Sequence, residues 1–140
     1  MASYEVVSAL IAAAEELGHS YHTGVTLSTD SFYAGQARPG LDGYQAQSVD
    51  SMLTNLRSIN VKNIEMEAAS LLAVANVYGL RAGAVCTAYA NRETGEFISG
   101  TDTAAAETAS LALHLLAKMD EKKAEHDCSH WNPFMSLTRS

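Results

Sequence analysis

The stretch VKNIEMEAASLLAVANVYG, residues 61–79, contains a short strand followed by a helix. Val61–Ile64 is expected to form the strand, and Glu67–Tyr78 is expected to form a helix that stops at Gly79. The helix is rich in alanine and leucine and is apolar on nearly all sides, which is typical of a helix buried in the interior. We therefore expect a strand–helix unit whose helix is covered by other parts of the protein.

Helices and short strands alternate on both sides of this unit. Apolar residues at helical spacing predict a helix over Ser3–Leu17, and Gly18 follows where a glycine commonly ends a helix. The other expected elements are a strand over Tyr21–Thr29, a helix over Ser48–Ile59 capped by Ser48, a strand over Leu80–Ala90 and a helix over Asp102–Met119. This alternation indicates an α/β fold built on a sheet.

The composition narrows the classes of protein to which the chain can belong. It has 140 residues, a formal net charge of −7, 47% hydrophobic residues and 18% charged residues, which together indicate one compact domain. The acidic balance argues against nucleic acid or an anionic membrane as the main partner, because phosphate-binding surfaces usually carry a basic excess. No apolar stretch approaches the roughly 20 residues that span a bilayer. The N-terminus lacks a basic secretory region and the two cysteines make no disulfide framework, so we expect a cytoplasmic protein.

Three polar stretches follow expected strands, where α/β sheets usually place their ligands. The first, DSFYAGQAR at residues 30–38, brings an aromatic ring, an amide and a guanidinium together. Phe32 offers a ring face, Gln36 offers both a donor and an acceptor, and Arg38 offers fixed donors, so a flat polar ligand fits this set. The alternative is a solvated loop with Phe32 tucked into the core.

The second stretch, NIEMEAA at residues 63–69, places Glu65 and Glu67 at a strand-to-helix junction. An ionised carboxylate offers only hydrogen-bond acceptors, so it can bind the paired hydroxyls of a ribose, which donate. The alternative is that these acids simply complement the helix macrodipole. The third stretch, TAYANR at residues 87–92, ends an expected strand with the cation Arg92, and the alternative there is a surface turn.

Taken together and in this order, the three stretches resemble the nucleoside phosphorylase superfamily, and within it the uridine phosphorylase family. The matching text is HTGVTLSTDSFYAGQAR at residues 22–38, NIEMEAASLL at residues 63–72 and YGLRAGAVCTAYANR at residues 78–92. The resemblance implies the C-terminal part of a three-layer α/β/α fold with a mixed central sheet. Residues 1–120 would form this partial domain and residues 121–140 a C-terminal tail.

The resemblance implies a base pocket. Positions matching Gln36 and Arg38 bind the uracil edge, and the position matching Phe32 packs on the nucleoside. The position matching Arg92 lies near the base carbonyl O4. Purine-cleaving relatives carry an aspartate where this chain has Asn91, so the resemblance favours a pyrimidine.

The same resemblance implies a ribose site and a reaction. Met66 and Glu67 match residues that contact the ribose, so Glu67 and Arg92 are the expected catalytic residues. The implied activity is the reversible phosphorolysis of uridine to uracil and ribose 1-phosphate, with phosphate as co-substrate and with neither a metal nor an organic cofactor. The alternative is a non-catalytic module that binds pyrimidine nucleosides.

The chain also departs from the uridine phosphorylase pattern. The N-terminal half of these enzymes, with its glycine-rich phosphate loop, has no match here, and its loss would leave an open sheet edge and uncovered apolar faces. We therefore expect a homo-oligomer or an association with an N-terminal half. The tail carries HDCSH at residues 126–130 but lacks the paired cysteines of a structural zinc site. Cys86 is expected to be a small buried hydrophobe.

Overall fold

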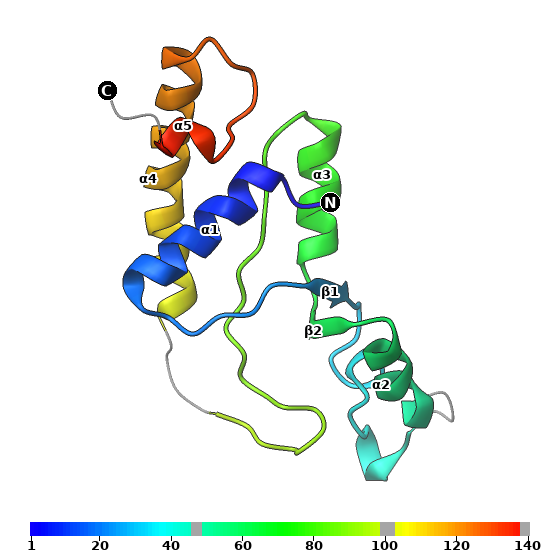
Figure 1. The fold of residues 1–140 in the computed structure, drawn as a ribbon. Helices are drawn as coiled ribbons and strands as arrows, with labels where there is room; N and C mark the ends of the chain where they lie inside the picture. The colour runs from blue at the N-terminus through cyan, green and yellow to red at the C-terminus, as the bar shows by residue number, and fades with distance from the viewer. Residues whose placement is uncertain (46–48, 99–102, 138–140) are drawn as a thin grey trace.

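The computed structural model describes residues 1–45, 49–98 and 103–137, and it contains several helices and a small parallel sheet (Figure 1). In chain order the elements are α1 Tyr4–Leu17, β1 Val25–Ser28, η1 Ala34–Gln36, η2 Leu41–Gly43, α2 Val49–Ser58, β2 Val61–Glu65, α3 Ala68–Val77, α4 Ala104–Glu125 and α5 Phe134–Leu137. The mixture of helices with a parallel sheet confirms an α/β fold. The expected cap Ser48 and the expected helix start Asp102 lie outside the described residues.

The first and last long helices, α1 and α4, pack against each other and hold the core (Figure 1). Three small side chains, Ala9, Ala13 and Ala112, form the contact together with Met119. Small side chains allow two helices to approach closely. The predicted end of α1 is confirmed, because Gly18 takes the left-handed conformation at φ 70° and closes the last turn.

An ion cluster ties α1, α4 and the segment after α3 together. Glu5 is buried and accepts hydrogen bonds from Arg81, from Lys123 at 3.0 Å and from the backbone N–H of Trp131 at 3.1 Å. Asp120 accepts from the same two cations, at 2.7 Å from Arg81 and 2.8 Å from Lys123. Burial raises the pKa of Glu5, but its three donors outweigh burial and hold that pKa below its ordinary value. The cluster therefore fixes the tail, through Trp131, to the helical core.

The two strands, β1 and β2, pair in parallel, and both were expected from the sequence. Ser28 at the end of β1 lies opposite Glu65 at the end of β2. The chain passes through α2 between them, as parallel strands need a crossover connection. The strand predicted over Tyr21–Thr29 is confirmed with narrower bounds, and that over Val61–Ile64 extends one residue further.

The strand predicted over Leu80–Ala90 is wrong. In the described part of the chain, the only strand-like pairing of this segment is an isolated bridge between Ala90 and Phe97. A strand forms when a neighbouring strand takes up its N–H and C=O groups, and the backbone here bonds elsewhere. Leu80 donates to Ala75 at 2.8 Å, and the carbonyl of Ala82 accepts from Ser3 at 2.7 Å. Because the segment is not covered, Cys86 is exposed rather than buried.

The helix α3 is also less buried than its composition predicts. Leu71 is 54% exposed, Val74 is 56% exposed and Val77 is 82% exposed, although Ala68 and Ala75 are buried. The described residues place α1 and α4 to one side of α3 and leave its outer face uncovered (Figure 1). The sequence carries the apolar surface of a buried helix without supplying enough other residues to cover it.

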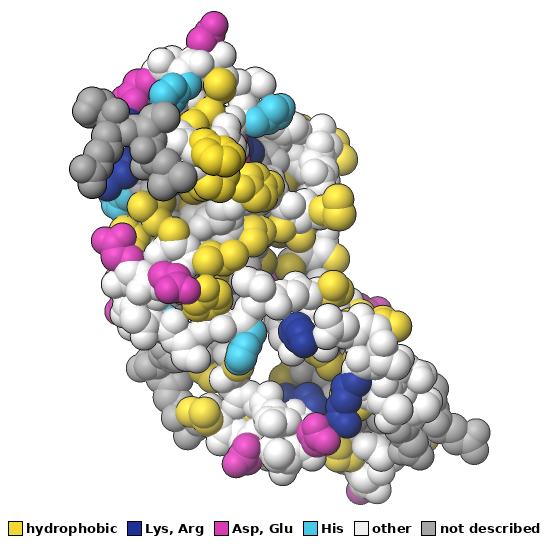
Figure 2. Space-filling view, viewed as in Figure 1, with side chains coloured by type: hydrophobic (Ala, Val, Ile, Leu, Met, Phe, Trp, Pro, Cys, Tyr) yellow, Lys and Arg dark blue, Asp and Glu magenta, His cyan; other side chains and the backbone are white. Residues whose placement is uncertain are grey.

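Apolar side chains consequently reach the surface over a wide area. Figure 2 shows hydrophobic side chains across the middle and upper parts of the visible face. Among the described residues, no large side chain is fully buried. None of the described helices is long and apolar enough to cross a membrane.

Candidate functional site

The candidate site begins where the two parallel strands end. After the Ser28–Glu65 pair, the backbone N–H of Thr29 still donates to the Glu65 carbonyl at 2.9 Å. The stretch at residues 30–38 therefore leaves the sheet beside Met66 and Glu67. Ligands of α/β sheets bind at this carboxyl edge.

Glu65 joins both strands to the start of α3. Its carboxylate accepts the Ser28 hydroxyl, the N–H of Glu67 at 2.7 Å and the N–H of Ala68 at 2.6 Å. Ser28 Oγ in turn accepts the N–H of Ala69 at 2.8 Å. Burial raises the pKa of Glu65, but these donors outweigh burial and hold that pKa below its ordinary value. Glu65 thus caps the orphan N–H groups of the helix.

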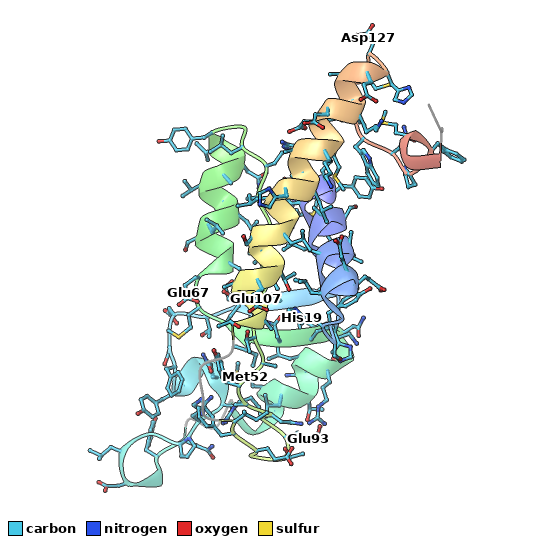
Figure 3. All side chains as sticks on the ribbon, turned by 90° about the vertical axis from the view of Figure 1, so that its left-hand side faces the viewer. His19, Met52, Glu67, Glu93, Glu107 and Asp127 are labelled. Atoms are coloured by element: carbon cyan, nitrogen blue, oxygen red, sulfur yellow. The ribbon has the colours of Figure 1, made fainter. Side chains whose placement is uncertain are left out.

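Glu67 differs from Glu65 in what its carboxylate faces. Glu67 is exposed, and among the described residues its carboxylate accepts a hydrogen bond only from the N–H of Met66, at 3.2 Å. Figure 3 shows Glu67 at the first turn of α3, level with the strands. Its oxygens remain available to hydroxyl donors of a ligand.

The loop after β1 folds into a tight turn that carries Gln36, which is buried, and Arg38, which is partly buried. The N–H groups of Gln36 and Arg38 both donate to the Tyr33 carbonyl, at 3.2 and 2.8 Å. Between them Ala37 adopts the left-handed conformation at φ 52°. A side chain at Gly35 would overlap the Thr29 hydroxyl, so the loop can approach the end of β1 only with glycine there.

Arg38 lies over the ring of Phe32. The guanidinium carbon is 4.2 Å from the ring centroid, a cation–π contact. Phe32 is half exposed rather than tucked into the core. Arg38 Nε is buried and has no hydrogen-bond partner among the described residues. This turn therefore carries an unused donor beside an aromatic face.

Arg92 reaches the same turn from a distant part of the chain. Its Nε donates to the Gln36 carbonyl and its Nη2 to the Ala37 carbonyl, each at 3.1 Å. Burial, and then the charge of Arg38, hold the pKa of Arg92 below its ordinary value. The next residue back, Asn91, accepts the N–H groups of Glu93 and Thr94 and so shapes the turn that carries Arg92.

The structure brings the sequence-predicted residues into two groups on one edge of the sheet. Around the loop after β1, Arg38 lies over the Phe32 ring and Arg92 binds the backbone carbonyls of Gln36 and Ala37. Met66 and Glu67 follow the neighbouring strand. Within the described residues, no hydrogen bond or ion pair joins the two groups. No cluster of three or more metal-binding side chains was found among the described residues.

Comparison with known proteins identifies the family to which this site belongs. The family model described as "Phosphorylase superfamily" matches residues 1–117. The chain belongs to the phosphorylase superfamily. Residues 118–140, with the end of α4 and all of α5, lie beyond the matched region.

Individual members of the phosphorylase superfamily are similar over different lengths. A uridine phosphorylase of Thermococcus kodakarensis is 50% identical over 135 residues, which cover 96% of this chain and 49% of that protein. The uridine phosphorylase of Escherichia coli is 38% identical over 99 residues, 69% of this chain and 38% of that protein. A guanosine phosphorylase of Halorubrum lacusprofundi is 34% identical over 92 residues, 66% of this chain and 33% of that protein. The chain spans about half the length, or less, of the curated relatives it matches.

Two features of the site are not visible in the sequence. The pairing of Ser28 with Glu65, which separates Glu65 from Glu67 in role, depends on strand register. The bonds from Arg92 to the carbonyls at 36 and 37 are independent of side-chain identity at those positions. The stretches at residues 30–38 and 87–92 each indicate a polar site, but neither indicates a contact between them.

Proposed function

We propose that this chain supplies the base and ribose sites of a uridine phosphorylase. The reaction would be the reversible phosphorolysis of uridine to uracil and ribose 1-phosphate. The observation that carries the proposal is the meeting of Phe32, Gln36, Arg38 and Arg92 at the sheet edge that also bears Glu67. The similarity to proteins named uridine phosphorylase supports a pyrimidine substrate over a purine one.

The chemistry of the base site fits this reaction. As the bond between C1′ and N1 breaks, its electron pair leaves with uracil, and the charge spreads onto O2 and O4. Preorganised donors aimed at a developing charge lower the barrier. Gln36 and the unpaired Nε of Arg38 would supply such donors, and Phe32 would pack on the nucleoside. The positive charge of the nearby Arg92 would further stabilise the negative charge that develops on uracil.

The ribose would be held by Glu67 and Met66. The Glu67 carboxylate would accept hydrogen bonds from the sugar hydroxyls, and Met66, 37% exposed, would contact the ring. Phosphate oxygen would then form the new bond to C1′ from the side opposite to uracil. No metal or organic cofactor enters this scheme, and phosphate is a co-substrate.

The phosphate site and the remaining apolar contacts would come from outside these residues. The exposed faces of α3 and of residues 80–98 fit a homo-oligomer or an association with an N-terminal half of the fold. We place this assembly in the cytoplasm, in nucleoside salvage.

Calorimetric titration with uridine tests the proposal. The 140-residue chain is titrated alone, and then after mixing with the part of the Thermococcus kodakarensis relative that this chain does not span. We expect uridine binding in both samples, and phosphate-dependent uracil release only in the mixture. Inosine serves as the control nucleoside and should bind more weakly. If uridine fails to bind in one or both samples, the base-site assignment is refuted. If uridine binds in the mixture and phosphate has no effect on it, the chain is a non-catalytic module.

A further inference from the structure

We propose that Arg92 is a positioning residue, which acts on the base by holding the turn at residues 36–38 in its binding form. The inference rests on the proposed function for the identity of the ligand. Arg92 Nε and Nη2 donate to two successive carbonyls, those of Gln36 and Ala37. A guanidinium is a rigid planar group, so two donors on one plane fix two peptide units at once.

The turn needs such a constraint. Ala37 has φ 52° and ψ 40°, a left-handed conformation that alanine adopts only at an energetic cost. The local bond that closes the turn at Ala37, from its N–H to the Ala34 carbonyl, is long at 3.4 Å. At 3.1 Å the bonds from Arg92 are shorter than this bond, although not shorter than the 2.8 Å bond from the Arg38 N–H to the Tyr33 carbonyl, and they connect the turn to a segment far along the chain. Without them, the local bonds alone would have to hold Ala37.

The peptide units that Arg92 holds set the directions of the two base-binding side chains. The Gln36 carbonyl belongs to the peptide between Gln36 and Ala37, and the Ala37 carbonyl to the peptide between Ala37 and Arg38. Rotation of either peptide would swing Gln36 or Arg38 away from its present place. A displacement of about 1 Å in a positioning group can lower a rate by a large factor.

The bonds to the turn also explain how two arginines tolerate each other. Arg38 stacks on the Phe32 ring, and Arg92 faces two carbonyl oxygens, so each cation has its own partially negative partner. Two of the three guanidinium nitrogens of Arg92 are therefore used by the backbone. A direct contact between Arg92 and the base would have to use Nη1 or the second N–H of Nη2.

Amide hydrogen exchange of the ligand-free chain tests the positioning role without reference to uridine. Arg92→Ala should speed exchange at residues 36–38 by about tenfold or more, because local opening becomes easier. Arg92→Lys keeps the charge but supplies one compact donor group, so it should give an intermediate effect. Arg57→Ala is the matched control, because Arg57 in α2 pairs at 2.8 Å with Glu93, the residue after Arg92, but has no bond to the turn among the described residues. Its exchange at residues 36–38 should match the parent.

Unchanged exchange at residues 36–38 in Arg92→Ala would overturn the inference. If Arg92→Ala fails to fold, as judged by exchange in α1 and α4, the comparison of Arg92→Lys with Arg57→Ala decides instead. Equal exchange in those two variants would also overturn it.

A double-mutant cycle on uridine affinity separates action through the turn from direct contact. If Arg92 acts through Gln36, the loss caused by Arg92→Ala should shrink by about threefold or more in a Gln36→Ala background. A loss of the same size in both backgrounds would mean that Arg92 contacts the base by itself and would refute the inference. Absence of uridine binding by the parent chain would refute the proposed function instead, and the exchange result would still stand.

Discussion

Two glutamates separated by a single residue make different contacts in this chain. Glu65 accepts three donors at the junction of β1, β2 and α3, whereas Glu67 keeps its carboxylate exposed at the first turn of α3. A carboxylate already filled with donors offers little to a ligand, so we assign the proposed ribose contact to Glu67 rather than to Glu65. The distinction arises from the pairing of Ser28 with Glu65, which the sequence alone does not show.

Removing a base-binding side chain should weaken uridine binding. Gln36→Ala and Arg38→Ala should each cost about 1–3 kcal/mol, the range for losing a hydrogen bond to a polar or charged partner. Isothermal titration of the chain with uridine measures the change, and Arg57→Ala is the matched arginine control. Parent-like affinity in either site variant would remove that residue from the base site.

Changing Asn91 to aspartate should not create a purine-cleaving enzyme. Asn91 Oδ1 accepts the N–H groups of Glu93 and Thr94, and an aspartate oxygen can accept the same bonds, so the turn should persist. Gln36 and Arg38 would still be arranged for a pyrimidine. In the assembly with the remaining part of the fold, Asn91→Asp should release no hypoxanthine from inosine. Inosine phosphorolysis by this single variant would contradict the assignment of specificity.

At the scale of elements, the start of α3 depends on Glu65. Glu65→Ala should lower the free energy of unfolding by about 1–2 kcal/mol, the range for losing a helix N-cap. Glu65→Gln retains an oxygen that can accept the N–H groups of Glu67 and Ala68, so it should cost less. Glu67→Ala is the control, because the only hydrogen bond of the Glu67 side chain in the described residues comes from the N–H of Met66. Urea unfolding followed by circular dichroism measures the free energy of unfolding of the three variants. Equal losses in Glu65→Ala and Glu67→Ala would show that Glu65 does not cap α3.

The ion cluster between α1 and α4 should make the fold sensitive to acid. Hydrogen bonds from Arg81 and Lys123 lower the pKa of Asp120 from 3.8 to about 2, and the pKa of Glu5 is also held below its ordinary value. A carboxyl whose pKa is lower in the folded state stabilises the fold above its unfolded pKa, and this contribution disappears as pH falls through the folded pKa. The melting temperature should therefore fall between about pH 4 and pH 2.

Neutral variants test the acid sensitivity. Asp120→Asn and Glu5→Gln should each lower the melting temperature at pH 6 and flatten its dependence on pH below 4. Lys122→Ala removes the pair with Glu125 on the exposed side of α4 and leaves the cluster intact, so its pH profile should parallel that of the parent. If the melting temperatures of Asp120→Asn and Glu5→Gln also depend on pH in parallel with that of the parent, the cluster does not control acid stability.

The elements that the sequence predicts correctly are those with local causes. The boundaries of α1 follow from apolar spacing and from Gly18, and β1 follows from the alternating character of the residues around Val25 and Thr26. The segment at residues 80–90 has the composition of a strand, but strand formation depends on a neighbour that the described residues do not provide. In the site, the three stretches were predicted because each follows a strand or an expected strand, whereas the contact of Arg92 with the backbone at 36 and 37 depends on tertiary structure.

At the scale of the whole molecule, the described residues have more apolar surface than they cover. The alanines that bring α1 and α4 together form a small core, while the outer side of α3 and the segment at residues 80–98 expose large apolar side chains. Exposed apolar patches of this kind mark interaction sites. This surface supports the proposed assembly with further polypeptide.

Whether the chain alone can catalyse phosphorolysis depends on which of its cations could hold phosphate. Phosphorolysis needs a phosphate dianion held against its own repulsion and aimed at C1′, which takes cations and oriented N–H groups. Among the arginines of the described residues, Arg38 lies over the Phe32 ring, Arg92 binds the carbonyls of residues 36 and 37, Arg57 pairs with Glu93, and Arg81 pairs with Glu5 and Asp120. We therefore expect the purified chain alone to bind uridine without turning it over.

Uracil release measured by chromatography, with and without phosphate, tests this expectation. The chain alone should give no signal above the blank, and the mixture with the remaining part of the Thermococcus kodakarensis relative should give phosphate-dependent release. Intact mass must show that the first sample contains only this chain. Phosphate-dependent release by that sample would mean that a phosphate site lies within these residues. The open hollow lined by Tyr21, His22, Thr23 and Lys62 would then be the first region to mutate, because Lys62 is the cation that borders it.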